Sequence, residues 1–185
     1  VLRAIKLEKD IEGTHPINVG RLAQRDREPV FIPCTPAGIL FLLDEYGIQL
    51  EGMQAVILGD SNIVGLPLAM LFLRRKATVT ICNVHTQNLR QIVRQADILV
   101  SAVGSAEMIR ADWVKPGGVV IDVGINYIAD PTQETGSRIV GDVAFDEVKE
   151  VAGAITPVPG GVGPMTVVML LKNILKAFKL QMNII

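Results

Sequence analysis

Short apolar runs alternate with longer amphipathic segments along most of the chain. Residues 55–58 form a continuous apolar run, as expected for a strand buried on both faces of a parallel sheet. Residues 77–82, 97–102 and 119–123 repeat this pattern, and Ile155 lies in a shorter run. Strands that alternate with helices over short connections are typical of a doubly wound parallel sheet. The chain is therefore predicted to be an α/β protein with a Rossmann-like fold.

Helices are predicted between these strands and at the end of the chain. Thr35 is a candidate N-cap with Pro36 in the first helical position, and Gly47 is expected to end that helix. The other predicted helices cover residues 66–74, 88–95, 142–151 and 164–178. Residues 1–35 are expected to be rich in loops, and residues 129–137 to form a surface loop or hairpin.

Composition narrows the classes of protein. Hydrophobic residues make up 49% of the chain and charged residues 20%, so a full core is available and disorder is not expected. A net charge of −1, without basic clusters, argues against nucleic-acid partners and membrane surfaces. No apolar run reaches the roughly 18–20 residues that span a membrane. Cys34 and Cys82 are too few for a disulfide framework or a metal cluster, so no metal is expected.

A glycine turn joins the first predicted strand to the next helix. Residues 59–65 place Gly59 and Gly65 at its two ends, where glycine allows a tight turn and a close approach of backbone to ligand. The helix that follows would direct its N-terminus at a pyrophosphate. The spacing departs from the G-x-G-x-x-G fingerprint, so a turn without a ligand stays open as the alternative.

Three further loops carry candidate chemistry. Residues 102–105 and 122–126 follow strands of the same sheet, and ligands of such sheets bind beyond the carboxyl ends of the strands. Asp122 could contact a ligand or could only bind loop backbone. Residues 156–166 combine three prolines and three glycines before a long helix. Such a loop could present free N–H groups to a carbonyl, carboxylate or phosphate.

Several of these motifs together resemble one family. Residues 61–67, 121–126 and 156–166 are similar to signatures of the methylenetetrahydrofolate dehydrogenase/cyclohydrolase family. Residues 9–13 and 18–22 resemble further family segments, as does the run Pro33-Cys34-Thr35-Pro36, so the resemblance covers nearly the whole chain.

The resemblance implies NAD(P)-dependent oxidation of 5,10-methylenetetrahydrofolate, followed in bifunctional members by hydrolysis of the methenyl product to 10-formyltetrahydrofolate. It assigns Asp10 and Glu12 to catalysis, and Gly160, Gly161, Val162, Gly163 and Pro164 to the substrate. It assigns these residues to the dinucleotide: Thr35, Gly59, Asp60, Ser61, Ile63, Val84, Ala102, Gly104, Val123, Ile125 and Thr166.

The sequence departs from the family pattern at several positions. Neither Tyr46 nor Tyr127 is followed four residues later by the lysine that the family uses in catalysis, and Glu12 replaces an aspartate. Asp60 stands where most members have arginine, and Asn83-Val84 replaces a His-Ser pair. A carboxylate would repel the 2′-phosphate of NADP and could bind a ribose, so NAD is expected to be preferred over NADP.

The resemblance also sets expectations for the whole protein. The chain begins with Val1, so an upstream catalytic domain with the lysine is expected. Residues 1–35 would be the remnant of that domain and a linker, and residues 36–163 would form the dinucleotide domain. Residues 164–185 would form a helix that returns to the catalytic domain. A homodimer through residues 129–145 is expected, in the cytoplasm, or in mitochondria or plastids if a transit peptide lies upstream. A dinucleotide-binding remnant without turnover is the alternative, and another Rossmann oxidoreductase is disfavoured because residues 156–166 would have no purpose there.

Overall fold

A five-stranded parallel sheet forms the centre of the molecule. The computed structural model describes residues 4–184, and the chain start at Val1 lies outside the described residues. The strands are β1 (Gln54–Leu58), β2 (Thr78–Cys82), β3 (Ile98–Ser101), β4 (Val119–Asp122) and β7 (Ala154–Ile155). Their order is β2-β1-β3-β4-β7, and every pair is parallel. The chain therefore reverses its direction of winding between β1 and β3, as in a doubly wound sheet.

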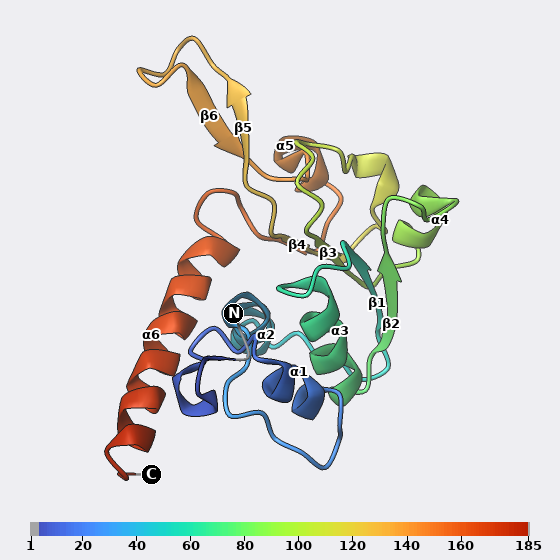
Figure 1. The fold of residues 1–185 in the computed structure, drawn as a ribbon. Coiled ribbons are helices and arrows are strands. Elements are labelled where there is room, and N and C mark those ends of the chain that lie inside the picture. Colours follow the sequence, from blue (N-terminus) through green and yellow to red (C-terminus); the bar gives the residue numbers. More distant parts are fainter. Residues whose placement is uncertain (1–3, 185) are drawn as a thin grey trace.

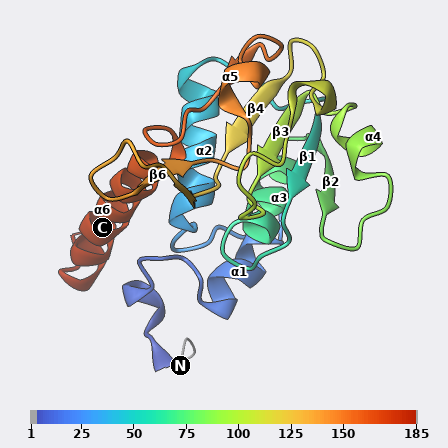
Figure 2. The same ribbon diagram turned by 90° about the horizontal axis from the view of Figure 1, so that it is seen from above.

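Helices cover both faces of this sheet (Figures 1 and 2). The α-helices are α1 (Pro16–Leu22), α2 (Cys34–Glu45), α3 (Gly65–Arg74), α4 (Leu89–Val93), α5 (Phe145–Val148) and α6 (Val162–Gln181). Two short 3₁₀ helices, η2 (Leu7–Lys9) and η3 (Ala111–Trp113), also lie in the described part of the chain. The α/β class expected from the sequence is confirmed.

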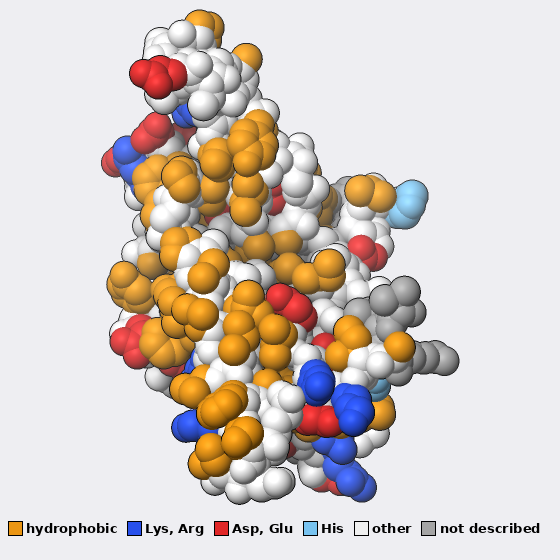
Figure 3. All heavy atoms as spheres, turned by 60° about the vertical axis from the view of Figure 1, so that its left-hand side comes forward, with side chains coloured by type: hydrophobic (Ala, Val, Ile, Leu, Met, Phe, Trp, Pro, Cys, Tyr) orange, Lys and Arg blue, Asp and Glu red, His pale blue; other side chains and the backbone are white. Residues whose placement is uncertain are grey.

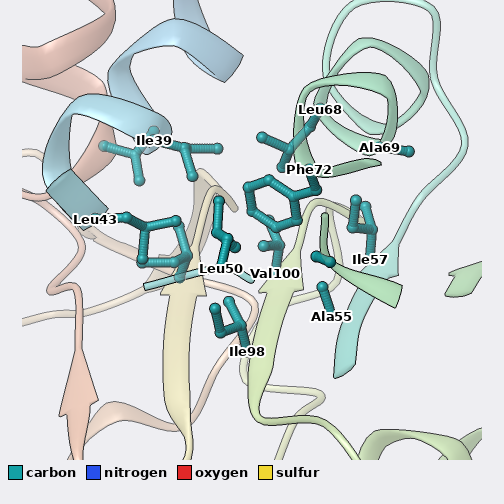
Figure 4. Packing of buried hydrophobic residues seen from close by; sticks show 13 residues of the cluster. Ile39, Leu43, Leu50, Ala55, Ile57, Leu68, Ala69, Phe72, Ile98 and Val100 are labelled. Carbon is teal, nitrogen blue, oxygen red and sulfur yellow. The ribbon is translucent and has the colours of Figure 1, made fainter. Parts of the chain in front are cut away.

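Alternate residues of the strands build two cores, one on each face of the sheet. Ile57 and Val100 point to the side covered by α2 and α3, where they surround Phe72 (Figure 4). Val56 and Leu99 point to the other side, toward α4 and α5, where Val93 and Val148 are fully buried. Burial on both faces explains why these strands are continuous apolar runs in the sequence.

Two elements stand apart from the sheet. The antiparallel hairpin of β5 (Asn126–Ala129) and β6 (Ser137–Val140) projects from the body, and α6 runs along one side with α2 between it and the sheet (Figures 1 and 2). The two helices pack closely because Gly38 of α2 has no side chain. A Cβ at this position would lie 3.1 Å from the Cβ of Met165 in α6.

Three helix predictions need correction. Helix α2 begins at Cys34 with Pro33 as its N-cap, so Thr35 is not the cap; its hydroxyl binds Thr166 instead. The helix predicted over residues 142–151 is reduced to α5, because the first of those residues, Asp142, is a buried hydrogen-bond acceptor whose backbone is not helical. Helix α4 is also shorter than the predicted span 88–95. Gly47 ends α2 as predicted, with a φ of +67°.

Residues 4–33 are held to the rest of the molecule by a few buried polar contacts. The side-chain amide of Asn173 in α6 donates to the carbonyl oxygens of Ile11 (2.7 Å) and Ile32 (3.2 Å). Gly13 lies against the backbone of Ile32, where a Cβ would have no room. Its φ of +69° also favours glycine at this position. The loop-rich N-terminal segment is thus folded onto α2 and α6.

Candidate functional site

The switch point of the sheet brings two of the predicted cofactor residues together. Gly59 follows β1 and Ala102 follows β3, and these two strands are neighbours. A Cβ on Gly59 would lie 2.4 Å from the carbonyl oxygen of Ala102, and the φ of Gly59 is +106°. Only glycine fits both conditions. Open α/β sheets bind their ligands at this position.

The turn from β1 to α3 is closed by a second glycine contact. A Cβ on Gly65 would lie 1.9 Å from the carbonyl oxygen of Gly59, so helix and strand meet without an intervening side chain. The Ser61 hydroxyl accepts a hydrogen bond from the Val64 amide (3.1 Å), which shapes the turn. The amides of residues 60–63 have no hydrogen-bond partner within the described chain. Free amides at a helix N-terminus are suited to a phosphate group.

Asp60 and Val84 lie at the outer end of this edge. The Asp60 carboxylate is exposed and accepts a hydrogen bond of 3.1 Å from the side-chain amide of Asn83, which follows β2. Val84 is 94% exposed, so its side chain makes almost no contact with the rest of the chain. A negative charge thus sits where the first two strands of the sheet end.

The loops after β3 and β4 are shaped by buried carboxylates. The Asp142 carboxylate accepts hydrogen bonds from the amides of Val103 and Gly104, and the Asp122 carboxylate accepts one from the amide of Gly124. Burial raises the pKa of Asp122 above its usual value, although hydrogen bonds from three backbone amides oppose this effect. Every hydrogen bond that the Asp122 carboxylate accepts comes from a backbone amide, which agrees with the structural alternative left open for this residue.

A cavity of about 380 Å³ lies beside these loops, a volume within the range of small-molecule sites. Residues of the proline–glycine loop from Pro157 to Pro164 line it, together with Val123 and Ile125. The Thr35 and Thr166 hydroxyls, which share a hydrogen bond of 3.0 Å, also line it. The Val158–Pro159 peptide bond is cis.

The cavity therefore collects the predicted substrate residues Gly160 to Pro164 with four of the predicted cofactor residues, which are Thr35, Val123, Ile125 and Thr166. The other predicted cofactor residues do not line it. Gly59, Asp60, Ser61, Ile63, Val84, Ala102 and Gly104 follow β1, β2 and β3 along the same edge of the sheet. A ligand that touched both groups would have to extend along this edge.

The two predicted catalytic carboxylates have different surroundings. Asp10 is buried and accepts hydrogen bonds from the His15 amide (2.9 Å) and the Asn18 side chain (2.7 Å), so it organises its own segment. Glu12 is exposed and close enough to Cys34 to influence its titration. Burial raises the pKa of the Cys34 thiol to about 11, and the negative charge of Glu12 adds to this shift. The catalytic assignment of both acids stays a prediction.

Two residues with many contacts were not singled out by the sequence. Asp142 and Asn173 each join segments that are far apart in the chain. Asp142 lies in a stretch whose amphipathic pattern favoured a helix, and Asn173 lies within the predicted helix 164–178 as one polar residue among apolar ones. A polar residue on the inward side of an apolar helix is the signal that could have indicated Asn173.

Among the described residues, no group of three or more His, Cys, Asp or Glu side chains is arranged to hold a metal ion. In the same part of the chain, no helix combines the length and apolar character needed to cross a membrane.

Comparison with known proteins identifies the family. Residues 33–182 match the family model of the tetrahydrofolate dehydrogenase/cyclohydrolase NAD(P)-binding domain. The chain is 54% identical to bifunctional protein FolD 4, chloroplastic, of Arabidopsis thaliana, over 97% of this chain and 50% of that protein. It is 56% identical to bifunctional protein FolD of Sinorhizobium fredii, over 96% of this chain and 58% of that protein.

A solved structure agrees with these matches. The methylenetetrahydrofolate dehydrogenase-cyclohydrolase (FolD) of Trypanosoma brucei, complexed with NADP and an inhibitor, superposes with a TM-score of 0.93 at 46% identity. The alignment covers 98% of this chain and 62% of that one, so the chain spans between 50% and 62% of the length of these relatives. The matches confirm the resemblance, and the chain belongs to the tetrahydrofolate dehydrogenase/cyclohydrolase family and contains its NAD(P)-binding domain.

Proposed function

We propose that the protein oxidises 5,10-methylenetetrahydrofolate with a nicotinamide dinucleotide and that this chain supplies the dinucleotide site and one wall of the folate site. The single observation that carries the proposal is the edge of the sheet where Gly59, Gly65 and the cavity beside residues 157–164 lie in succession. The relatives named as bifunctional FolD proteins support the reaction. The hydrolysis of the methenyl product is proposed on the same basis.

The residues of this chain fit a dinucleotide. Free amides at residues 60–63 and the N-terminus of α3 would hold the pyrophosphate, and the glycines allow its close approach. Val123 and Ile125 would cover the nicotinamide side of the cavity with apolar surface. When bound, the nicotinamide accepts the hydride. The chain's own contribution is to orient the reactants and exclude water from them.

Turnover by the full-length protein tests the proposal. Formation of reduced nicotinamide from methylenetetrahydrofolate supports it, and a folded full-length protein that binds dinucleotide but never forms reduced nicotinamide contradicts it. The second outcome is what the alternative, a binding remnant without turnover, predicts. That alternative is favoured by Glu12, which stands in place of an aspartate of the family pattern. In an active protein, Glu12→Gln and Glu12→Asp would test the proposed catalytic role of Glu12.

We propose that this chain prefers NAD, although the NADP bound to the trypanosomal relative favours NADP. The reason is local to this sequence. The exposed Asp60 carboxylate lies beside Asn83, where a 2′-phosphate dianion would meet a like charge. Isothermal titration with each dinucleotide measures the preference. Asp60→Asn is expected to tighten NADP binding, and Asp44→Asn, an exposed carboxylate on α2, is the control. NADP affinity equal to or above that for NAD would contradict the preference.

We further propose that the exposed face of α6 docks against the half of the protein outside this chain. Its apolar side chains run along the helix (Figure 3). They are Val167, Val168, Leu171, Ile174, Leu175 and Phe178, each at least 44% exposed. Exposed apolar patches of this kind are typical of interaction sites, and the relatives have as much sequence again to cover it. Protection of these residues from hydrogen exchange in the full-length protein would support this docking, and unchanged exchange would contradict it.

A homodimer through the β5–β6 hairpin is proposed on the family resemblance. A two-stranded hairpin is marginally stable alone in water, so a partner surface would explain why this one projects from the body (Figure 1). Tyr127 is 72% exposed on it. Sedimentation of the full-length protein should give a dimer and that of Tyr127→Asp a monomer; a monomeric wild type would contradict the proposal. The compartment is proposed to be the cytoplasm, a mitochondrion or a plastid.

A further inference from the structure

Two buried carboxylates lie beneath the edge of the sheet that carries the dinucleotide site. Asp122 ends β4 and Asp142 follows β6, and they are 3% and 0% exposed. Asp142 accepts five hydrogen bonds, from the amides of Val103, Gly104 and Ser105, the hydroxyl of Ser101 and the side-chain amide of Asn126. Asp122 accepts hydrogen bonds from the amides of Gly124, Asp142 and Val143. These acceptors join segments that are otherwise separate.

Asp142 determines the path of the loop after β3. The amides of Val103, Gly104 and Ser105 converge on its two oxygens, at 2.7, 3.3 and 3.0 Å. Three successive amides around one carboxylate form a concave arrangement that holds an anion. Here the anion belongs to the protein, so these amides are not available to a phosphate. The backbone of this loop is therefore held from below by a residue that does not itself line the cavity.

The same carboxylate is connected to both strands of the hairpin. Asn126, the first residue of β5, donates to Asp142 Oδ1 at 2.9 Å, and it pairs with Val140, the last residue of β6. Asp142 follows β6 after one glycine. Ile139 of β6 also lines the cavity. The base of the hairpin and the loops after β3 and β4 thus share one buried acceptor.

Two glycines make room for the carboxylates. A Cβ on Gly124 would lie 2.2 Å from Asp142 Oδ1, and a Cβ on Gly141 would lie 1.8 Å from Asp122 Oδ2. An alanine at Gly124 would displace Asp142, because the new Cβ would also lie 2.6 Å from the Asp142 backbone nitrogen. This substitution therefore tests the placement of Asp142 without changing its side chain.

We propose that Asp142 is a positioning residue for dinucleotide binding, and that through Asn126 it couples the occupancy of the dinucleotide site to the order of the β5–β6 hairpin. The inference rests on the proposed dinucleotide site. The hairpin bears the proposed dimer surface, so dinucleotide binding at the edge of the sheet would change the order of that surface. Asp142 acts through the loop backbone and touches no reacting atom.

Hydrogen exchange of the full-length protein, with and without NAD or NADP, tests the coupling. In the wild type, the dinucleotide should slow exchange in residues 126–140 as well as in residues 103–105. Asn126→Ala should still bind the dinucleotide and protect residues 103–105, but should lose the added protection of the hairpin. A residue that only stabilised the fold would raise exchange in the hairpin equally in both states.

Titration calorimetry on the same proteins tests the positioning role. Asp142→Asn and Gly124→Ala should each weaken dinucleotide binding by about 10- to 100-fold, the loss that corresponds to one hydrogen bond to a charged group. Gly20→Ala is the matched control, because a Cβ at Gly20 in α1 meets nothing within 4 Å. If Asp142→Asn does not fold, Gly124→Ala carries the test of the positioning role, and Asn126→Ala still tests the coupling.

The outcomes separate the inference from the proposed function. A wild type that binds the dinucleotide without protecting the hairpin, or an Asn126→Ala variant that keeps this protection, overturns the coupling and leaves the proposed function intact. Wild-type affinity in a folded Gly124→Ala variant overturns the positioning role. A folded wild type that binds neither dinucleotide removes the proposed function and the inference with it.

Discussion

Substitution of Gly65 by alanine perturbs the turn from β1 to α3 at its tightest point. The added Cβ would lie 1.9 Å from the Gly59 carbonyl oxygen and 2.8 Å from its carbonyl carbon, whereas ordinary contact is 3.4–4 Å. Both atoms are backbone, so no side chain can rotate away. The turn must therefore open by roughly 1.5 Å, the difference between the shortest distance and ordinary contact.

Two effects on stability oppose each other in this variant. Forcing atoms into a closely packed region costs about 1–3 kcal/mol. Alanine is favoured over glycine within a helix by about 1 kcal/mol, and Gly65 is the first residue of α3. The expected result is a net destabilisation of about 0–2 kcal/mol. Dinucleotide binding should weaken more, by about 100-fold or about 2.8 kcal/mol, because the free amides of residues 60–63 that would donate to the charged pyrophosphate move with the turn.

Urea unfolding and titration with NAD and NADP measure the two effects. Gly20→Ala is the control, since its new methyl group is unobstructed in the middle of α1 and should leave binding unchanged while slightly stabilising the fold. If Gly65→Ala were as stable as the wild type and bound the dinucleotide equally well, the steric explanation of this turn would be wrong.

Three further predictions concern buried groups. Because the pKa of Cys34 is raised to about 11 from an ordinary 9.0, its thiolate population near neutral pH should be about 100-fold lower than that of a free thiol. Alkylation of Cys34 should therefore require unfolding, and rapid alkylation of the folded protein would refute this. The raised pKa of Cys34 also makes the stability of the fold depend on pH. Its stabilising contribution is fully present below pH 9.0 and is lost as the pH rises through about 11. The free energy of unfolding of the wild type should therefore fall more steeply over that range than that of Cys34→Ala. Asn173→Ala removes the donor to two carbonyl groups and should lower the free energy of unfolding in urea by about 1–3 kcal/mol. The control Lys172→Ala, at the neighbouring exposed position, should lower it by less than about 0.5 kcal/mol. Equal effects of the two substitutions would contradict the structural role of Asn173.

The class of fold could be predicted from periodicity alone, because the inner strands β1, β3 and β4 are buried on both faces. The apolar run at residues 55–58 can be recognised as a strand without knowledge of the strands that pair with it. Strand β1 consists of these residues and Gln54. Gly59 and Gly65 could also be predicted, since a tight turn between a strand and a helix requires them locally. The family followed from motifs of the same local kind, including residues 156–166.

Contacts between distant segments could not be predicted in this way. Residues 142–151 have an amphipathic pattern, but the buried position of Asp142 under the loop after β3 replaces most of that helix with irregular backbone. Thr35 has the composition of an N-cap, but its hydroxyl binds Thr166, 131 residues later. In both cases a tertiary hydrogen bond outweighs a local preference worth about 1 kcal/mol.

The sequence by itself determined the strands of the central sheet, the helices α2, α3 and α6 and the turns that need glycine, because these depend on neighbours a few residues away. Only the tertiary structure decided that Asp122 and Asp142 organise the edge of the sheet and that Thr35, Val123 and Thr166 line one cavity. The physical reason is that a buried polar group must find a partner when water is excluded, and the fold determines which partner is within reach.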